Sequence, residues 1–274
     1  MAKHSKKSGP GTIAYTADRH ELYEKAVQDV SAEIDMVDET FESIRGFKAK
    51  TLREDFCGTG NTSCEWVRRR HDNLAIGLDL DSEVLEWGRK NKLSKLNEEQ
   101  RARLTLLQQD VMQADCASAD VLLAMNFSYQ IFKTRDSLRQ YFEQARAGLN
   151  ENGLLFIDAY GGHDSWKEVK EKTKYKGFHY YWHQKKFNPI TGDILCHIHF
   201  KFPDGSWMKK AFTYDWRSWT LPELRELIIE AGFAHVDVYW EGTDEESGEG
   251  DGTYFPTLKG DDDPSWIVYL VAQK

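Results

Sequence analysis

Glu54-Asp-Phe-Cys-Gly-Thr-Gly60 is the stretch on which our interpretation of this sequence rests. It overlaps the end of a strand that we predict over 51–56, and it leads into a helix predicted over 61–70. Two glycines separated by one residue at a strand-to-helix turn let the backbone come close to a ligand. The free N–H groups at the start of the helix point to the same place. The turn alone indicates only a generic nucleotide loop, so the residues downstream decide its meaning.

Acidic and polar residues follow the next predicted strands, at the point where each strand ends. The run 74–79 ends in Asp79, 19 positions after Gly60, where a βαβ unit places a carboxylate beside a nucleotide ribose. Asp81 and Ser82 are better placed than Asp79 to cap the helix that we predict over 83–91. Strand 104–109 is followed by Asp110, and strand 119–125 by Asn126. Open α/β sheets bind ligands at this carboxyl edge.

The order of the predicted elements defines the fold class. Helix 134–149 and strand 154–158 complete a β-α-β-α-β-β-α-β pattern, which predicts a doubly wound, mostly parallel sheet. Alternating polar and apolar residues over 194–202, with aromatic-rich 178–187 and 207–216, predict an antiparallel β insert. A helix starting at the capping box Thr220-Leu-Pro-Glu223, and strands 235–240 and 265–272, bring the sheet to seven strands. The acidic, Gly-rich segment 241–252 is predicted to be a loop.

These elements predict a domain plan and exclude several function classes. We expect a tail at 1–12, a main domain over 13–162 and 218–274, and the insert over 163–217. The formal net charge of −9 and the short Lys/Arg clusters disfavour a nucleic-acid partner. The sequence contains no long apolar run, which predicts no membrane span, and its N-terminus has no hydrophobic signal segment. Four cysteines without C-x-x-C spacing indicate reduced thiols, so we expect a cytoplasmic protein.

Taken together, these residues resemble the class I S-adenosylmethionine-dependent methyltransferases, which have a Rossmann-like fold. Glu54, Gly58 and Gly60 match most of that family's first motif, acid-x-G-x-G-x-G. The resemblance covers about 40–160 and 218–274 and implies S-adenosyl-L-methionine as cofactor and S-adenosyl-L-homocysteine as product. It also implies the residues of the cofactor site: Glu54, Phe56, Cys57, Gly58 and Gly60 at the turn, Asp79 with Leu80, Asp110 with Val111, and Asn126 with Phe127.

Two features depart from the family's pattern or extend it. Phe56 replaces the first glycine of the motif, so we expect its ring to pack away from the cofactor, against the first helix or the N-terminal segment. The β insert resembles that of small-molecule N-methyltransferases, including those acting on amino sugars and glycine. There it covers the acceptor site or forms a dimer contact, and a homodimer through this insert is therefore an expectation here.

The chemistry needs few protein groups, because methyl transfer is an in-line displacement that mainly requires positioning of the acceptor. The acceptor is expected to be a small molecule that receives the methyl group on N or O. Tyr129 and Tyr160 are candidate walls of its pocket, and His197 is a candidate base. Tyr15 and Tyr23, in a predicted helical region, either pack in the protein or form a lid over the cofactor.

Three alternatives stay open. His197 and His199 share a strand face, as do His179 and His183, yet no carboxylate or cysteine completes a metal site, so none is predicted. A dinucleotide-dependent oxidoreductase would also use Asp79, but Ser63 stands where the third glycine of G-x-G-x-x-G is needed. A methyltransferase-like module that binds cofactor or a partner without turnover is the non-enzyme alternative.

Overall fold

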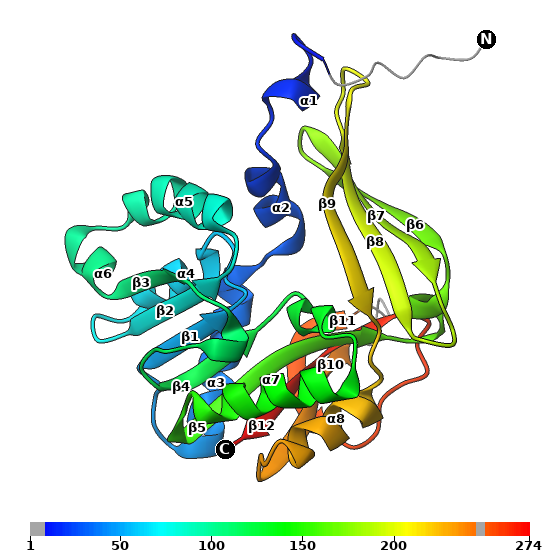
Figure 1. Ribbon diagram of the computed structural model, residues 1–274. Helices are drawn as coiled ribbons and strands as arrows, with labels where there is room; N and C mark the ends of the chain where they lie inside the picture. Colours follow the sequence, from blue (N-terminus) through cyan, green and yellow to red (C-terminus); the bar gives the residue numbers. More distant parts are fainter. Residues whose placement is uncertain (1–8, 245–249) are drawn as a thin grey trace. The chain divides into compact units, whose positions relative to one another are not determined.

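The computed structural model describes residues 9–244 and 250–274, which divide into two compact units. The larger unit comprises residues 30–162 and 220–274, and the smaller unit comprises residues 9–29 and 163–219. Figure 1 follows the chain through both units by colour. Within the described residues, no helix is long and apolar enough to cross a membrane. All four cysteines are free thiols.

The larger unit is built on an eight-stranded sheet with the order β11-β10-β12-β5-β4-β1-β2-β3. Neighbouring strands from β5 to β3 pair in parallel, whereas β12 is antiparallel to both β5 and β10, and β11 is antiparallel to β10. The strand bounds are β1 Thr51–Asp55, β2 Leu74–Asp79, β3 Leu104–Gln108, β4 Ala119–Ala124, β5 Leu149–Gly161, β10 His235–Thr243, β11 Gly250–Thr257 and β12 Trp266–Gln273.

Helices lie on both faces of this sheet (Figure 1). One face is covered by α3 and α4, whose Phe41, Trp66 and Val67 pack into the core with Leu52 of β1. On the other face, Tyr141 of α7 reaches Asp55 of β1. The helix bounds are α3 Val30–Arg45, α4 Asn61–Arg69, α5 Ser82–Asn91, α6 Glu98–Ala102, α7 Arg135–Ala147 and α8 Leu221–Glu230, with short 3-10 turns η1 Leu93–Lys95, η2 Val111–Gln113 and η3 Ser128–Ile131.

The smaller unit is a four-stranded antiparallel sheet with two short helices. Its strand order is β6-β7-β8-β9. Leu22 packs with Phe178, Ile198 and Phe200 in its core, because the apolar stripe of the N-terminal helices meets the apolar face of these strands. The bounds are α1 Ile13–Thr16, α2 Arg19–Val27, β6 Val169–Tyr175, β7 Phe178–Phe187, β8 Asp193–Lys201 and β9 Trp207–Arg217, with a 3-10 turn η4 at His163–Trp166.

The α/β class with a mostly parallel sheet and an antiparallel insert is confirmed, with three differences in detail. The sheet has an eighth strand, β11, and the insert has a fourth, β6, both at edges where polar sequences pair. The segment 241–252, predicted as a loop, contributes Glu241–Thr243 to β10 and Gly250–Gly252 to β11, and 245–249 lie outside the described residues. Residues 13–29, which the domain plan placed with the main sheet, cluster with the insert.

Candidate functional site

The carboxyl ends of β1 to β5 lie at one edge of the larger sheet. Asp55 of β1 pairs with Leu78 of β2, and Asp79 of β2 pairs with Gln108 of β3. On the other side, β1 pairs with β4, and Ala124 at the end of β4 pairs with Ile157 of β5. The register therefore brings to one edge the glycine turn and the polar residues that follow strands two, three and four.

The glycine turn adopts a left-handed backbone at both glycines. Gly58 has φ of 53° and Gly60 has φ of 69°, a region that glycine occupies without steric cost. A third glycine, Gly88 of α5, lets that helix lie against the turn, since a Cβ there would be 2.3 Å from the carbonyl oxygen of Thr59. A Cβ at Gly58 would meet no atom within 4 Å. The turn is thus held from one side and open beside Gly58.

Glu54 holds the start of the helix that follows the turn. Its carboxylate accepts a hydrogen bond from the backbone N–H of Ser63 at 2.9 Å and a short one from the Ser63 hydroxyl. The helix begins after Gly60, which has no side chain for a cap, so Glu54 takes the capping role. Burial raises the pKa of Glu54 to about 7, although hydrogen bonds from Ser63 favour its ionised form.

Asp79 connects the glycine turn to the end of the second strand. Its Oδ2 accepts the backbone N–H of Gly58 at 2.8 Å, and its Oδ1 accepts that of Asp81 at 2.9 Å. Burial raises the pKa of Asp79 from its ordinary value. Each carboxylate oxygen has two lone pairs, so both can accept a further hydrogen bond from a ligand. Leu80, the next residue, is 63% exposed.

Asp110 and Val111 occupy the end of the third strand. Asp110 caps the short turn η2 by accepting the backbone N–H of Met112 at 2.9 Å. Val111 is buried. The backbone N–H of Gln109, just before Asp110, donates to the carbonyl oxygen of Asp79 at 3.2 Å. The two acids predicted to bind the cofactor are therefore carried by neighbouring, directly connected strand ends.

Asp158, which is not among the site residues predicted from the sequence, organises the loop after the fourth strand. Asn126 and Phe127 both adopt left-handed backbone, with φ of 58° and 57°. Their N–H groups donate to the two oxygens of Asp158, each at 2.8 Å. Burial raises the pKa of Asp158 to about 7. The only signal for it in the sequence is an acid at the end of the apolar run Leu154-Leu-Phe-Ile-Asp158.

Phe56 also has left-handed backbone, with φ of 57°. Its ring packs against Phe132 and Tyr141, with ring centroids 6.1 and 5.7 Å away. Beneath it lies a buried ion pair in which Arg53 Nε is 2.7 Å from Asp55 Oδ1. The Tyr141 hydroxyl donates a hydrogen bond to Asp55 Oδ2 at 3.1 Å, which connects this ion pair to α7.

The candidate catalytic and lid residues are distributed over both units. Tyr129 is fully buried and packs against Phe142, which places it within the core of the larger unit. Tyr160, near the end of β5, lies edge-on to Phe127 with ring centroids 4.8 Å apart. Three further candidates belong to the smaller unit: His197, which is buried, Tyr23, which packs against Phe212, and Tyr15, which is 64% exposed. Their roles stay predictions. Cys57, also predicted at the site, is buried beneath the turn.

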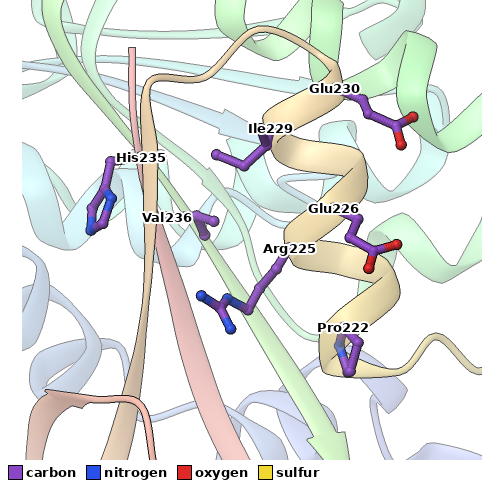
Figure 2. A pocket seen from close by; sticks show the side chains of 7 residues that line it. All are labelled: Pro222, Arg225, Glu226, Ile229, Glu230, His235 and Val236. Carbon is purple, nitrogen blue, oxygen red and sulfur yellow. The ribbon is translucent and has the colours of Figure 1, made fainter.

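A separate hollow of about 520 Å³ lies between α8 and β10 (Figure 2). Its lining mixes apolar Pro222, Ile229 and Val236 with charged residues of the helix. Strands β12, β5 and β4 separate β10 from β1 in the sheet, so this hollow does not belong to the glycine turn. Within residues 9–244 and 250–274, no group of three or more His, Cys, Asp or Glu is arranged to hold a metal ion.

The fold of this chain is similar to that of solved methyltransferase structures. No family model and no curated protein sequence matches the chain. Among solved structures, an S-adenosylmethionine-dependent methyltransferase from Clostridium acetobutylicum is similar at a TM-score of 0.67 and 14% identity, covering 93% of this chain and 96% of that chain. Streptomyces venezuelae DesVI is similar at a TM-score of 0.67 and 17% identity, covering 93% of this chain and 98% of that chain. The S-adenosylmethionine-bound amino pentose methyltransferase CalS10 from Micromonospora echinaspora is similar at a TM-score of 0.64 and 15% identity, covering 93% of this chain and 95% of that chain. The chain therefore has the fold of these methyltransferases.

Proposed function

We propose that this protein is an S-adenosylmethionine-dependent methyltransferase that acts on a small molecule. The observation that carries the proposal is the hydrogen bond of Asp79 to the N–H of Gly58, which joins the glycine turn to a strand-end carboxylate. That pair has the chemistry that an adenosine ribose needs: a backbone open to close approach and an acid with spare acceptors. The similar structures include methyltransferases described with this cofactor bound, which supports the same assignment here.

The residues at the sheet edge fit the other parts of the cofactor. Leu80 presents an exposed apolar side chain beside Asp79, where an adenine ring would gain from contact with it. Asp110 would accept from the adenine amino group, and the Asn126-Phe127 loop would stand near the sulfonium. When bound, the cofactor supplies the activated methyl group. The protein's part is to hold an acceptor atom in line with that group, which can contribute about 7–11 kcal/mol.

The similar structures support a proposal for the acceptor class. Their descriptions name an amino pentose methyltransferase, a sugar N-methyltransferase and a glycopeptide N-methyltransferase. We propose an amine or hydroxyl of a small molecule as acceptor, with amino sugars first in order of testing. A base is needed only when the acceptor must lose a proton before attack. We propose that Tyr160, beside Phe127 at the same sheet edge, contacts such an acceptor.

A thermal-shift comparison tests the cofactor class. S-adenosylhomocysteine at a hundred times its dissociation constant should stabilise the protein by about 2.7 kcal/mol, whereas NAD⁺ and NADPH should have no effect. Stabilisation by a nicotinamide nucleotide alone would assign the site to an oxidoreductase. Transfer of labelled methyl groups to a panel of amines, amino sugars and alcohols then separates an enzyme from a module that binds the cofactor without turnover.

A further inference from the structure

One face of the insert sheet gathers lysines that lie far apart in the sequence. Along the edge strand β6, Lys170, Lys172 and Lys174 alternate with other residues, so their side chains share a face. They pair with His183, Tyr181 and His179 of β7. Those residues pair in turn with His197, His199 and Lys201 of β8. The opposite face carries Ile198 and Phe200, which pack in the core of the smaller unit.

The insert that carries this face is strongly basic within an acidic protein. Residues 163–217 contain eleven Lys and Arg against six Asp and Glu, a formal charge of +5, although the whole chain carries −9. The three lysines of β6 are exposed, as are Lys209 and Lys210 of β9. Burial together with nearby lysines lowers the pKa of His199 to about 4, and the same causes lower the pKa of His179, His183 and His197. These histidines are therefore neutral hydrogen-bonding groups among the ammonium groups.

Two aromatic rings lie among the lysines. The rings of Tyr181 and Trp207 are 4.9 Å apart, and each is only partly buried. Lys170 Nζ lies 5.2 Å from the first ring centroid and 5.3 Å from the second, and Lys201 Nζ lies 5.3 Å from Trp207. An ammonium group held over a ring can move to a phosphate when a nucleobase stacks on that ring in its place. This face thus offers both groups that a single-stranded nucleic acid needs, ammonium groups for its phosphates and rings for its bases.

We propose that this face of β6–β9 binds a single-stranded polynucleotide, its phosphates on the lysines and its bases on Tyr181 and Trp207. Successive lysines on β6 are about 6.6 Å apart, since alternate residues of a strand share a face. This spacing is comparable to that of phosphates along an extended single strand. The Lys/Arg clusters are short in the sequence and alone disfavour a nucleic-acid partner, but the register of the four strands brings these lysines together. The proposal does not depend on the methyltransferase assignment.

Fluorescence anisotropy with a labelled oligouridylate of about 12 nucleotides tests this site. We expect saturable binding that weakens more than tenfold between about 50 and 200 mM salt, as for about three phosphate contacts. The double variant Lys172→Glu, Lys174→Glu should bind at least tenfold more weakly. The double variant Lys90→Glu, Lys95→Glu changes the net charge equally, at exposed positions of the larger unit, and should bind within twofold of the original protein. Equal thermal midpoints of the two variants would show that both are folded.

Three results would overturn the proposal. The first is no binding of the oligonucleotide at low salt. The second is an equal loss in both double variants, which would mean that only the overall charge of the chain matters. The third is binding to vesicles rich in phosphatidylserine without binding to the oligonucleotide, which would assign the face to an anionic lipid surface.

Discussion

Asp158 Oδ2 accepts the backbone N–H of Asn126 at 2.8 Å, although the two residues belong to different strand ends. Its other oxygen accepts the N–H of Phe127, so one buried carboxylate fixes two successive residues in left-handed backbone. Such conformations cost on the order of 1–3 kcal/mol each and persist only where the surroundings enforce them. We infer that Asp158 is a positioning residue for the loop nearest the predicted methyl group.

Replacing Asp158 with Ala should therefore affect both stability and ligand binding. The loss of an acceptor for two N–H groups should lower the free energy of unfolding by about 2–4 kcal/mol. The dissociation constant for S-adenosylhomocysteine should rise at least tenfold, measured by calorimetry. Asp120→Ala is the matched control, because Asp120 Oδ2 also accepts two backbone N–H groups, from Lys50 and Thr51, at the start of β1. It should lower stability and leave affinity unchanged; an equal loss of affinity in both variants would contradict the positioning role.

The raised pKa of Glu54 should make stability depend on pH. Its pKa is about 7 in the folded protein against an ordinary 4.5, so the folded state holds the proton more tightly than the unfolded state. The free energy of unfolding should therefore fall as pH rises from about 4.5 to about 7, by on the order of 3 kcal/mol from this group. Asp158 contributes in the same direction.

Glu54→Gln isolates this contribution, since the glutamine oxygen can still accept the Ser63 N–H without a charge. Measured by urea unfolding between about pH 5 and pH 8, the free energy of unfolding of this variant should depend less steeply on pH than that of the original protein. Glu83→Gln, an exposed residue in the first turn of α5, should leave the dependence unchanged. An unaltered slope in Glu54→Gln would show that its carboxyl group titrates normally.

Phe56 should prove a packing residue that does not obstruct the cofactor. Phe56→Gly removes the contacts with Phe132 and Tyr141 but relieves a left-handed backbone, so the net loss of stability should be only about 1–2 kcal/mol. Affinity for S-adenosylhomocysteine should stay within threefold. Phe56→Leu, which keeps an apolar side chain and the backbone strain, should bind equally well. A tenfold gain in affinity on Phe56→Gly would mean that the ring occupies cofactor space.

The sequence predicted best what depends on local periodicity and on strand ends. The strand Leu74–Asp79 and its terminal acid agree with the structure, because a short apolar run followed by an acid is itself the signal. The positions of Asp110 and Asn126 at the same sheet edge follow from parallel pairing alone. Asp81 caps α5 as expected, leaving Asp79 to the glycine turn.

Features that depend on pairing between distant segments could not be predicted in the same way. The contact of Asp158 with Asn126 requires the register of β4 against β5, which no local pattern specifies. Residues 13–29 show an apolar stripe, but a stripe does not say which sheet it will cover. The edge strands β6 and β11 are polar, and their residues have a weak intrinsic preference for strand structure. They form strands because they pair with β7 and β10.

Calorimetric titration with S-adenosylhomocysteine tests the central claim most directly. We predict a single site on the original protein, and a dissociation constant at least a hundredfold higher in Asp79→Ala, which loses both the proposed ribose acceptor and the hydrogen bond from Gly58. Asp81→Ala, which removes only the cap of α5, should bind within threefold of the original protein. The absence of any heat of binding at about millimolar ligand, or equal affinity of the Asp79→Ala variant, would contradict the account.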